Sequence, residues 1–444
     1  MKAKILIAAT LLIIQGSYIA PAYGQNSNWT VQKCIDYALQ KNIQVQKSLL
    51  NTESNKVNFD AVKASRFPIV DASTSQSIGW ADKQNVVSGN YSFNGTANSN
   101  YSVNSSMTLY AGSKIKQSIK QSELVYKAGQ YDSEAMKETI SLNIMDAFLQ
   151  ILYAGEQVKN TQNQIDLTNK ELELAKERLD LGVIATSDYL LVKSQLATEQ
   201  QNLASAQGLL ATDRVTLMQF MELPITDTFQ IAHPDLTNVI NRMKNTLPDS
   251  VYRIALGLKP QIKSAELNTQ SAALSVDIAN ADYKPRIGLS AGFNTNYLSS
   301  IKSSDYPFQL SHNFSPSIGL SLSVPIYHNN EIRSKVDLAK ISTENAKLDE
   351  QNTKNVLRKS IETACTNVVT AQNEYDASRE QYLSAKESYT VAAEKYAQEI
   401  LNSTDFLVQK TNYNAAESAF LQSKYNLIFT YKTLDFYLGI PFNF

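Results

Sequence analysis

The side chains that most often carry catalysis or bind metals are few and scattered in this sequence. His233, His312 and His328 lie far apart, and no HExxH pair occurs. Cys34 and Cys365 fall at positions typical of buried helix residues, and two cysteines are too few for a disulfide scaffold. The 15 glycines form no phosphate-binding motif, and no nucleophile motif is present. We therefore expect no enzymatic activity, no cofactor and no metal site.

Two aspartates follow hydroxyl side chains at the start of predicted helices, in the segments Thr186-Ser187-Asp188 and Ser403-Thr404-Asp405. In one interpretation, these side chains accept hydrogen bonds from the free N–H groups of the helix that follows. In the other, the carboxylates lie at the narrow end of a pore, where they gate or select by charge. The two segments alone leave both interpretations open.

The composition and the first residues indicate an exported protein. Lys and Arg number 41 against 42 Asp and Glu, a balance that argues against nucleic acid as a partner. Lys2 and Lys4 precede an apolar run, and Ala22-Tyr23-Gly24 forms a small-x-small cleavage site, so residues 1–24 are predicted to be a signal peptide. No later window is long and apolar enough for a membrane helix. Any membrane span would therefore consist of strands.

The chain matches itself at a single spacing. Pairs separated by 217 residues are Pro68 and Pro285, Tyr110 and Tyr327, Asp188 and Asp405, and Pro224 and Pro441. A period this long predicts two fused copies of one domain-sized motif rather than a solenoid. The predicted organisation is a signal peptide (1–24), a first repeat (25–232), a linker beside the helices (233–250) and a second repeat (251–444).

Each copy shows two alternating segments that predict strands. Val70, Ile78 and Trp80 share one face, whereas Asp71 and Ser73 share the other. The four predicted strands cover about 69–82, 97–110, 286–298 and 314–327. Strands of this length, apolar outside and polar inside, are typical of outer-membrane barrels. A soluble sandwich alternates in the same way, and the signal peptide favours the membrane.

The remaining segments predict two very long helical hairpins, at about 113–222 and 330–438. Neither 113–181 nor 330–400 contains a proline, and apolar residues recur in heptads. The heptad positions of the first long helix are Ile144, Ile151, Val158, Ile165, Leu172 and Leu179. Four strands per chain leave open edges that a bilayer does not tolerate. We therefore expect a mostly α fold with transmembrane β, in which several chains side by side close one barrel that the helices continue below the membrane. Three chains would give a 12-stranded β-barrel continued by a periplasmic α-helical barrel.

Several motifs resemble those of the TolC-like outer-membrane efflux factors. They are the junctions Phe67-Pro68 and Lys284-Pro285, the strand exits Thr108-Leu109-Tyr110-Ala111-Gly112 and Val324-Pro325-Ile326-Tyr327, and the first hairpin tip, 181–188. The resemblance implies a homotrimeric channel in the outer membrane of a Gram-negative bacterium, in contact with lipid and extending into the periplasm. It also implies that the hairpin tips dock onto a periplasmic adaptor protein of an inner-membrane pump.

The resemblance also implies roles for single residues. Asp405 matches the first of two acidic positions that ring the family's aperture, and the second falls at the apolar Val408. Tyr396 matches a tyrosine that ties the two hairpins shut, with Asp188 as its mate, and the accompanying arginine position holds Leu401. Ordinary packing in the helix seam is the alternative for Tyr396. The adaptor-docking tips would comprise Leu181, Gly182, Val183, Ile184, Ala185, Thr186 and Ser187, then Glu399, Ile400, Leu401, Asn402, Ser403 and Thr404.

The function expected from the sequence is passive conduction through the outer membrane. The chain would serve as the exit duct of a tripartite export system, for small molecules or secreted protein. The alternative is a non-conducting trimeric structural protein or adhesin of the outer membrane, which the polar inner face of the strands disfavours.

Overall fold

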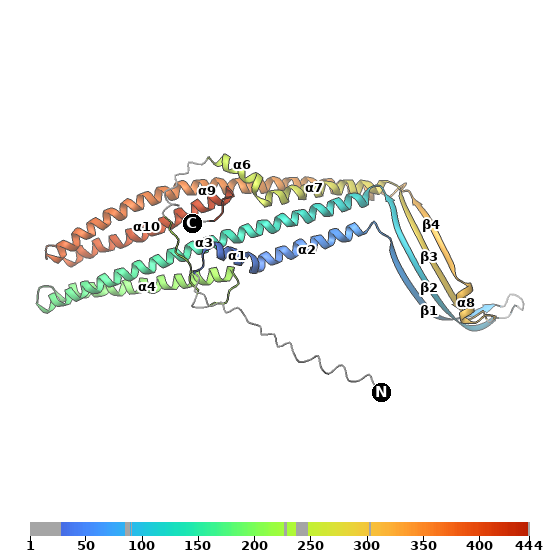
Figure 1. Ribbon diagram of the computed structural model, residues 1–444, viewed down its shortest axis with the longest axis horizontal. Helices are drawn as coiled ribbons and strands as arrows, with labels where there is room; N and C mark the ends of the chain where they lie inside the picture. The colour runs from blue at the N-terminus through green and yellow to red at the C-terminus, as the bar shows by residue number, and fades with distance from the viewer. Residues whose placement is uncertain are drawn as a thin grey trace, which may run out of the picture.

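The computed structural model describes residues 28–84, 89, 91–225, 229–236, 247–301 and 303–442. The molecule is elongated, with a sheet at one end and the tips of two helical hairpins at the other (Figure 1). The expected signal peptide lies outside the described residues, as do residues 237–246 of the expected linker.

Helices dominate the described residues, and those of the first half recur in the same order in the second half, which also contains additional short helices. The first half holds α1 (Val31–Lys41), α2 (Ile43–Ala64), α3 (Lys114–Asp180) and α4 (Thr186–Phe220). The second half holds α6 (Pro248–Leu258), α7 (Pro260–Asn280), the short η1 (Ala281–Tyr283), α8 (Tyr306–His312), α9 (Glu331–Ala397) and α10 (Ser403–Tyr437). α3 and α9 have 67 residues each, and α4 and α10 have 35 each. At about 1.5 Å per residue, α3 and α9 are about 100 Å long.

The sheet contains four antiparallel strands in the order β1-β2-β3-β4. They are β1 (Ile69–Gln84), β2 (Tyr91–Ala111), β3 (Arg286–Leu298) and β4 (Ser315–Ser323). β4 ends earlier than the sequence predicted, because Pro325 has no N–H to donate to a strand ladder. The register places Val70, Val103, Leu289 and Leu320 on one face and serines, asparagines and glycines on the other.

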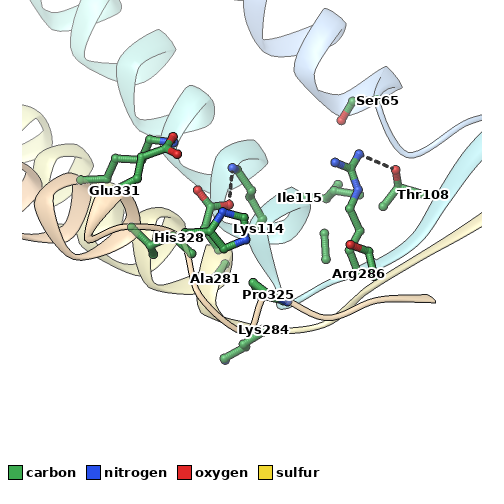
Figure 2. Close-up of a pocket in the computed structure, with 15 residues that line it drawn as sticks. Ser65, Thr108, Lys114, Ile115, Ala281, Lys284, Arg286, Pro325, His328 and Glu331 are labelled. Atoms are coloured by element: carbon green, nitrogen blue, oxygen red, sulfur yellow. Dashed lines mark hydrogen bonds and ion pairs between the residues drawn. The ribbon is translucent and has the colours of Figure 1, made fainter. Parts of the chain in front are cut away.

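A charged and polar junction lies where the sheet meets the helices (Figure 2). The Lys114 Nζ atom lies 2.6 Å from Asp282 Oδ1, and this ion pair joins the start of α3 to η1. Gly112 adopts a left-handed φ of 61°, and a Cβ there would lie 2.7 Å from the Ala281 carbonyl oxygen. A side chain at Gly112 would therefore force the start of α3 away from η1.

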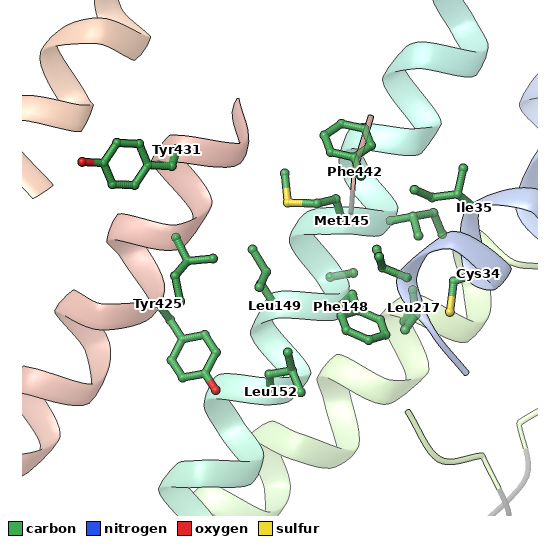
Figure 3. Packing of buried hydrophobic residues seen from close by; sticks show 14 of the residues in the cluster. Cys34, Ile35, Met145, Phe148, Leu149, Leu152, Leu217, Tyr425, Tyr431 and Phe442 are labelled. Atoms are coloured by element: carbon green, nitrogen blue, oxygen red, sulfur yellow. The ribbon is translucent and has the colours of Figure 1, made fainter. Parts of the chain in front are cut away.

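The main core lies midway along the helices (Figure 3), where α1, α3, α4, α6, α9 and α10 contribute buried side chains. Phe148, Leu152 and Leu217 are almost fully buried there. Both cysteines are buried and unpaired, and burial raises the pKa of the Cys34 thiol to about 12. Cys34 is therefore an apolar packing residue rather than a reactive thiol, in agreement with its position on a buried helix stripe.

Candidate functional site

The first hairpin tip is a tight turn that exposes apolar side chains. Gly182 has a left-handed φ of 73°, and the Val183 amide donates to the Arg178 carbonyl oxygen at 2.8 Å. This pattern ends α3 and reverses the chain. Leu181 is 79% exposed and Val183 is also exposed, but Ile184 turns inward and packs against the apolar cluster between the hairpins. Leu181 and Val183 are thus the apolar surface of this tip.

The second tip repeats the same backbone with a different residue. Glu399 takes a left-handed φ of 60° at the position equivalent to Gly182. Ile400 is exposed, and its amide donates to the Lys395 carbonyl oxygen at 2.9 Å. Leu401 packs against the inter-hairpin cluster. The left-handed backbone is therefore strained at Glu399, whereas Gly182 adopts it in the first tip without that strain.

Neither helix that follows a tip is capped by the hydroxyl or aspartate side chains that the capping interpretation named. The N-cap of α10 is Asn402, whose Oδ1 accepts from the Asp405 amide at 2.7 Å and whose Nδ2 donates to the Asp405 carboxylate at 2.9 Å. The N-cap of α4 is Ala185, which has no capping side chain. Ser187 and Thr404 lie inside the first helical turns, so the interpretation that they cap these helices is wrong. Asp405 is exposed and held in place by Asn402.

The hydrogen bond expected between Tyr396 and Asp188 is not formed. Tyr396 is only 5% exposed, and its buried hydroxyl has no hydrogen-bond partner within the described structure. Its ring stacks on Phe406, with centroids 4.6 Å apart and planes 5° from parallel. Asp188 lies in the first turn of α4 and is partly exposed. Packing in the helix seam thus holds Tyr396, whose hydroxyl contributes no tie.

The residue that does connect the two tips is Arg178, which the sequence analysis missed. Its Nη1 and Nη2 atoms donate to the carbonyl oxygens of Tyr396 and Ala397 at 3.1 and 3.0 Å. Its guanidinium carbon lies 5.1 Å from the centre of the Tyr396 ring, and the residue is 8% exposed. Arg178 belongs to the last turn of α3, but its hydrogen bonds satisfy free carbonyl groups at the end of α9. A basic residue in a last helical turn was the available signal.

A second connection between the hairpins is a buried charge cluster, which we define as Lys410, Glu171, Glu199 and Thr168. Lys410 is 1% exposed, and its Nζ atom lies 2.6 Å from Glu171 Oε2 and 3.6 Å from Glu199 Oε1. Thr168 bonds both Lys410 and Glu199. Burial raises the pKa of Glu171, while Lys410 opposes that shift. The cluster joins α3, α4 and α10 in low-dielectric surroundings.

The sheet presents opposite chemistry on its two faces. On the apolar face, Ile318, Leu320 and Leu322 of β4 are strongly exposed. On β1 this face runs from Val70 to Trp80, which is about 33 Å along the strand and about 25 Å in height at a typical barrel tilt. That height matches the lipid-facing band of outer-membrane strands. The opposite face carries hydroxyl groups in contact, such as Ser73 and Ser102 at 2.7 Å.

The family model described as "Outer membrane efflux protein" matches residues 34–221 and 251–440, one match for each half of the chain. The chain belongs to the outer membrane efflux protein family. It is accordingly a protein of the Gram-negative outer membrane that extends into the periplasm. The two matched ranges contain all four strands of the sheet and all but the first residues of the helices that recur in both halves.

Individual relatives of this efflux protein are distant in sequence and close in fold. The chain is 21% identical over 402 residues to "Toxin and drug export protein A" of Aggregatibacter actinomycetemcomitans, covering 90% of this chain and 83% of that protein. The crystal structure of the Campylobacter jejuni CmeC outer membrane channel superposes with a TM-score of 0.80 at 19% identity, covering 92% and 85% of the two chains. VceC of Vibrio cholerae superposes with a TM-score of 0.78 at 16% identity, covering 93% and 97%.

The described residues of this efflux protein contain neither a helix that could span a membrane nor a cluster of metal ligands. None of their helices is long and apolar enough to cross a membrane. They also contain no group of three or more His, Cys, Asp or Glu side chains placed to hold a metal ion.

Proposed function

We propose that this efflux protein is the exit duct of a tripartite export system, a passive conduit without a catalytic step. Three copies stand side by side, and the β4 edge of one sheet pairs with the β1 edge of the next. Twelve strands then form a barrel, with the Val70 face toward lipid and the Ser73 face toward the lumen. The helical hairpins continue the lumen into the periplasm, where an adaptor protein and an inner-membrane pump deliver the cargo.

The observation that carries this proposal is a four-stranded sheet with two open edges and two chemically opposite faces. The edge strands β1 and β4 leave backbone N–H and C=O groups unpaired, which is costly in lipid. Pairing between copies satisfies those groups. A closed trimer also removes Ile318 and Leu320 from water and places them in the bilayer.

Trimer formation is tested on protein extracted from outer membranes in mild detergent. The expected product is a trimer that dissociates on heating before electrophoresis. Recovery of a stable monomer from the membrane fraction would overturn the barrel, because a single chain cannot pair both edges.

Conduction is tested by inserting the purified trimer into a planar lipid bilayer. Discrete single-channel currents are expected, because the polar face lines a continuous lumen. A trimer that inserts without conducting would favour the alternative of a structural protein or adhesin of the outer membrane.

A further inference from the structure

A cavity of about 480 Å³ lies at the junction between sheet and helices (Figure 2). Thr108, Arg286 and Ser323 line it, and the strand register places all three on the polar face of the sheet. The first turns of α3 and α9 complete the wall with Lys114 and Glu331. The cavity therefore opens on the face that becomes the lumen in the proposed trimer.

Cationic side chains outnumber carboxylates around this cavity. The cationic lining residues are Lys114, Lys284, Arg286 and Lys335, and the acidic ones are Asp282 and Glu331. Both carboxylates are already engaged, Asp282 by Lys114 and Glu331 by Lys335, each at 2.6 Å. Lys335, together with nearby His328, also lowers the pKa of Glu331, so this carboxylate is held in its charged form. Two cations, Arg286 and Lys284, have no carboxylate partner among the described residues.

Arg286 is oriented across the polar face rather than toward an acid. Its Nη2 atom donates to Thr108 Oγ1 at 3.1 Å, a neutral hydroxyl that fixes the guanidinium without neutralising it. The closest neighbours on this face, Gly288, Ser321 and Ser323, are also neutral. Arg286 is exposed, so its remaining N–H donors are available to a ligand. A guanidinium fork matches the paired oxygens of an oxyanion.

We propose that the junction cavity is an anion-binding site at the base of the strand barrel, with Arg286 as its main ligand and Lys284 in support. It recognises cargo that carries a carboxylate, sulfate or phosphate group. The inference rests on the proposed trimeric channel, in which threefold symmetry repeats Arg286 around the lumen. A ring of unneutralised cations there raises the local concentration of anions and lowers that of cations.

The test uses the full-length trimer in a planar bilayer, with inorganic pyrophosphate as the probe anion. Pyrophosphate is expected to reduce the single-channel current of the unchanged protein. Arg286→Ser should raise the concentration needed for half block by about fivefold, since each site loses a unit charge in a high-dielectric lumen. The same substitution should shift the reversal potential in a KCl gradient toward cation preference. Arg286→Lys, which keeps the charge, should retain most of the block.

Arg333→Ser is the matched control, because Arg333 lies on α9 next to the cavity wall without lining it and is strongly exposed. Its block and reversal potential should equal those of the unchanged protein. Equal block in Arg286→Ser and in the unchanged protein would overturn the anion site while leaving the channel intact. A complete lack of channel current would instead overturn the proposed function, and the inference with it.

Discussion

The Tyr396 side chain combines a stabilising ring with a costly hydroxyl. The ring stacks on Phe406, whereas the buried oxygen has no partner in the described structure. An unsatisfied buried polar group costs about 1–3 kcal/mol. We therefore expect Tyr396→Phe to raise the temperature at which the detergent-solubilised helices unfold, measured by circular dichroism, and to leave channel conductance unchanged. Tyr396→Ala should destabilise the tip because it also removes the stacking. A rise in conductance in the Phe variant would instead support the expected hydrogen bond between Tyr396 and Asp188.

Arg178 makes the contacts that hold the end of α9 against α3. Two separate nitrogens of its planar guanidinium donate to adjacent carbonyl oxygens, a fork geometry that the single nitrogen of a lysine does not reproduce. Because charged hydrogen bonds contribute about 1.5–3 kcal/mol, Arg178→Met should lower the free energy of unfolding by about that amount. Arg253→Met is the control, since Arg253 is exposed and pairs only within its own helix. This variant should change the free energy of unfolding by less than about 0.5 kcal/mol. Equal stability of the two variants would show that Arg178 is not a tie.

Glu399 adopts a backbone conformation that suits glycine. Its φ of 60° costs a side-chain-bearing residue about 1–2 kcal/mol. The carboxylate lies 4.0 Å from the Arg178 Nε atom and is exposed, so this ion pair contributes little. Glu399→Gly should therefore raise the free energy of unfolding by about 1 kcal/mol, in the same chemical-denaturation assay. A loss of stability would mean that the contact with Arg178 outweighs the backbone strain.

The sequence predicted which residues lie at the tips but not how they pair. The spacing of residues along the chain predicts only that Asp188 and Tyr396 each lie close to a chain reversal. Whether their side chains touch depends on how the hairpins pack against each other. In the structure Phe406 and Arg178 cover the Tyr396 ring and leave Asp188 apart. Contacts between helices that are distant in sequence carry no local signal of this kind.

At the scale of elements, the duplication was easier to predict because its causes are local. The proline-free segments and heptads gave both long hairpins, and α3 and α9 begin and end 217 residues apart. The backbone also repeats where the residues differ. Glu222 has a φ of 54° at the position equivalent to Gly439, with a φ of 73°. The residue type of Glu222 therefore gave no indication of a left-handed turn, although the glycine at the equivalent position in the other repeat did.

The buried charge cluster gives the helices a predictable pH dependence. Burial raises the pKa of Glu171 above its usual value of 4.5, with Lys410, Glu199 and the Tyr389 hydroxyl facing it. A carboxyl with a raised folded-state pKa binds its proton more tightly in the folded protein. Its contribution to stability is therefore complete below pH 4.5 and declines as the pH rises through the raised pKa.

Glu171→Gln tests this dependence because it imitates the protonated carboxyl. We expect the unfolding temperature of the unchanged protein to decline as the pH rises above 4.5, and we expect the Glu171→Gln variant to lack this decline. Glu173→Gln, at an exposed position on the same helix, should keep that decline. Identical pH profiles for the Glu171 variant and the unchanged protein would locate the pH-sensitive group elsewhere.

At the scale of the whole molecule, the sheet and the hairpin tips would perform separable tasks in the proposed channel. The sheet and the tips lie at opposite ends of helices about 100 Å long (Figure 1). Substitutions at the tips therefore leave the strand edges untouched, so trimer formation and docking can be measured independently. Four strands with open edges predicted an assembly of several chains, and the chain reversals predicted the position of the tips. Neither feature predicted which apolar tip residues face outward.

Adaptor docking at the tips is the prediction that uses this separation. Leu181, Val183 and Ile400 expose apolar side chains that nothing in the described chain covers, and exposed apolar patches mark interaction sites. The triple change of these residues to Asp should abolish export of an antibiotic by cells that supply the cognate adaptor and pump. Trimer yield and bilayer conductance should stay unchanged, because no strand edge or lumen wall is altered. Ile184→Asp is the contrasting variant, since Ile184 packs between the hairpins and its change should reduce the yield of folded trimer. Export that survives the triple change would place the docking surface on the sides of the helices instead of the tips.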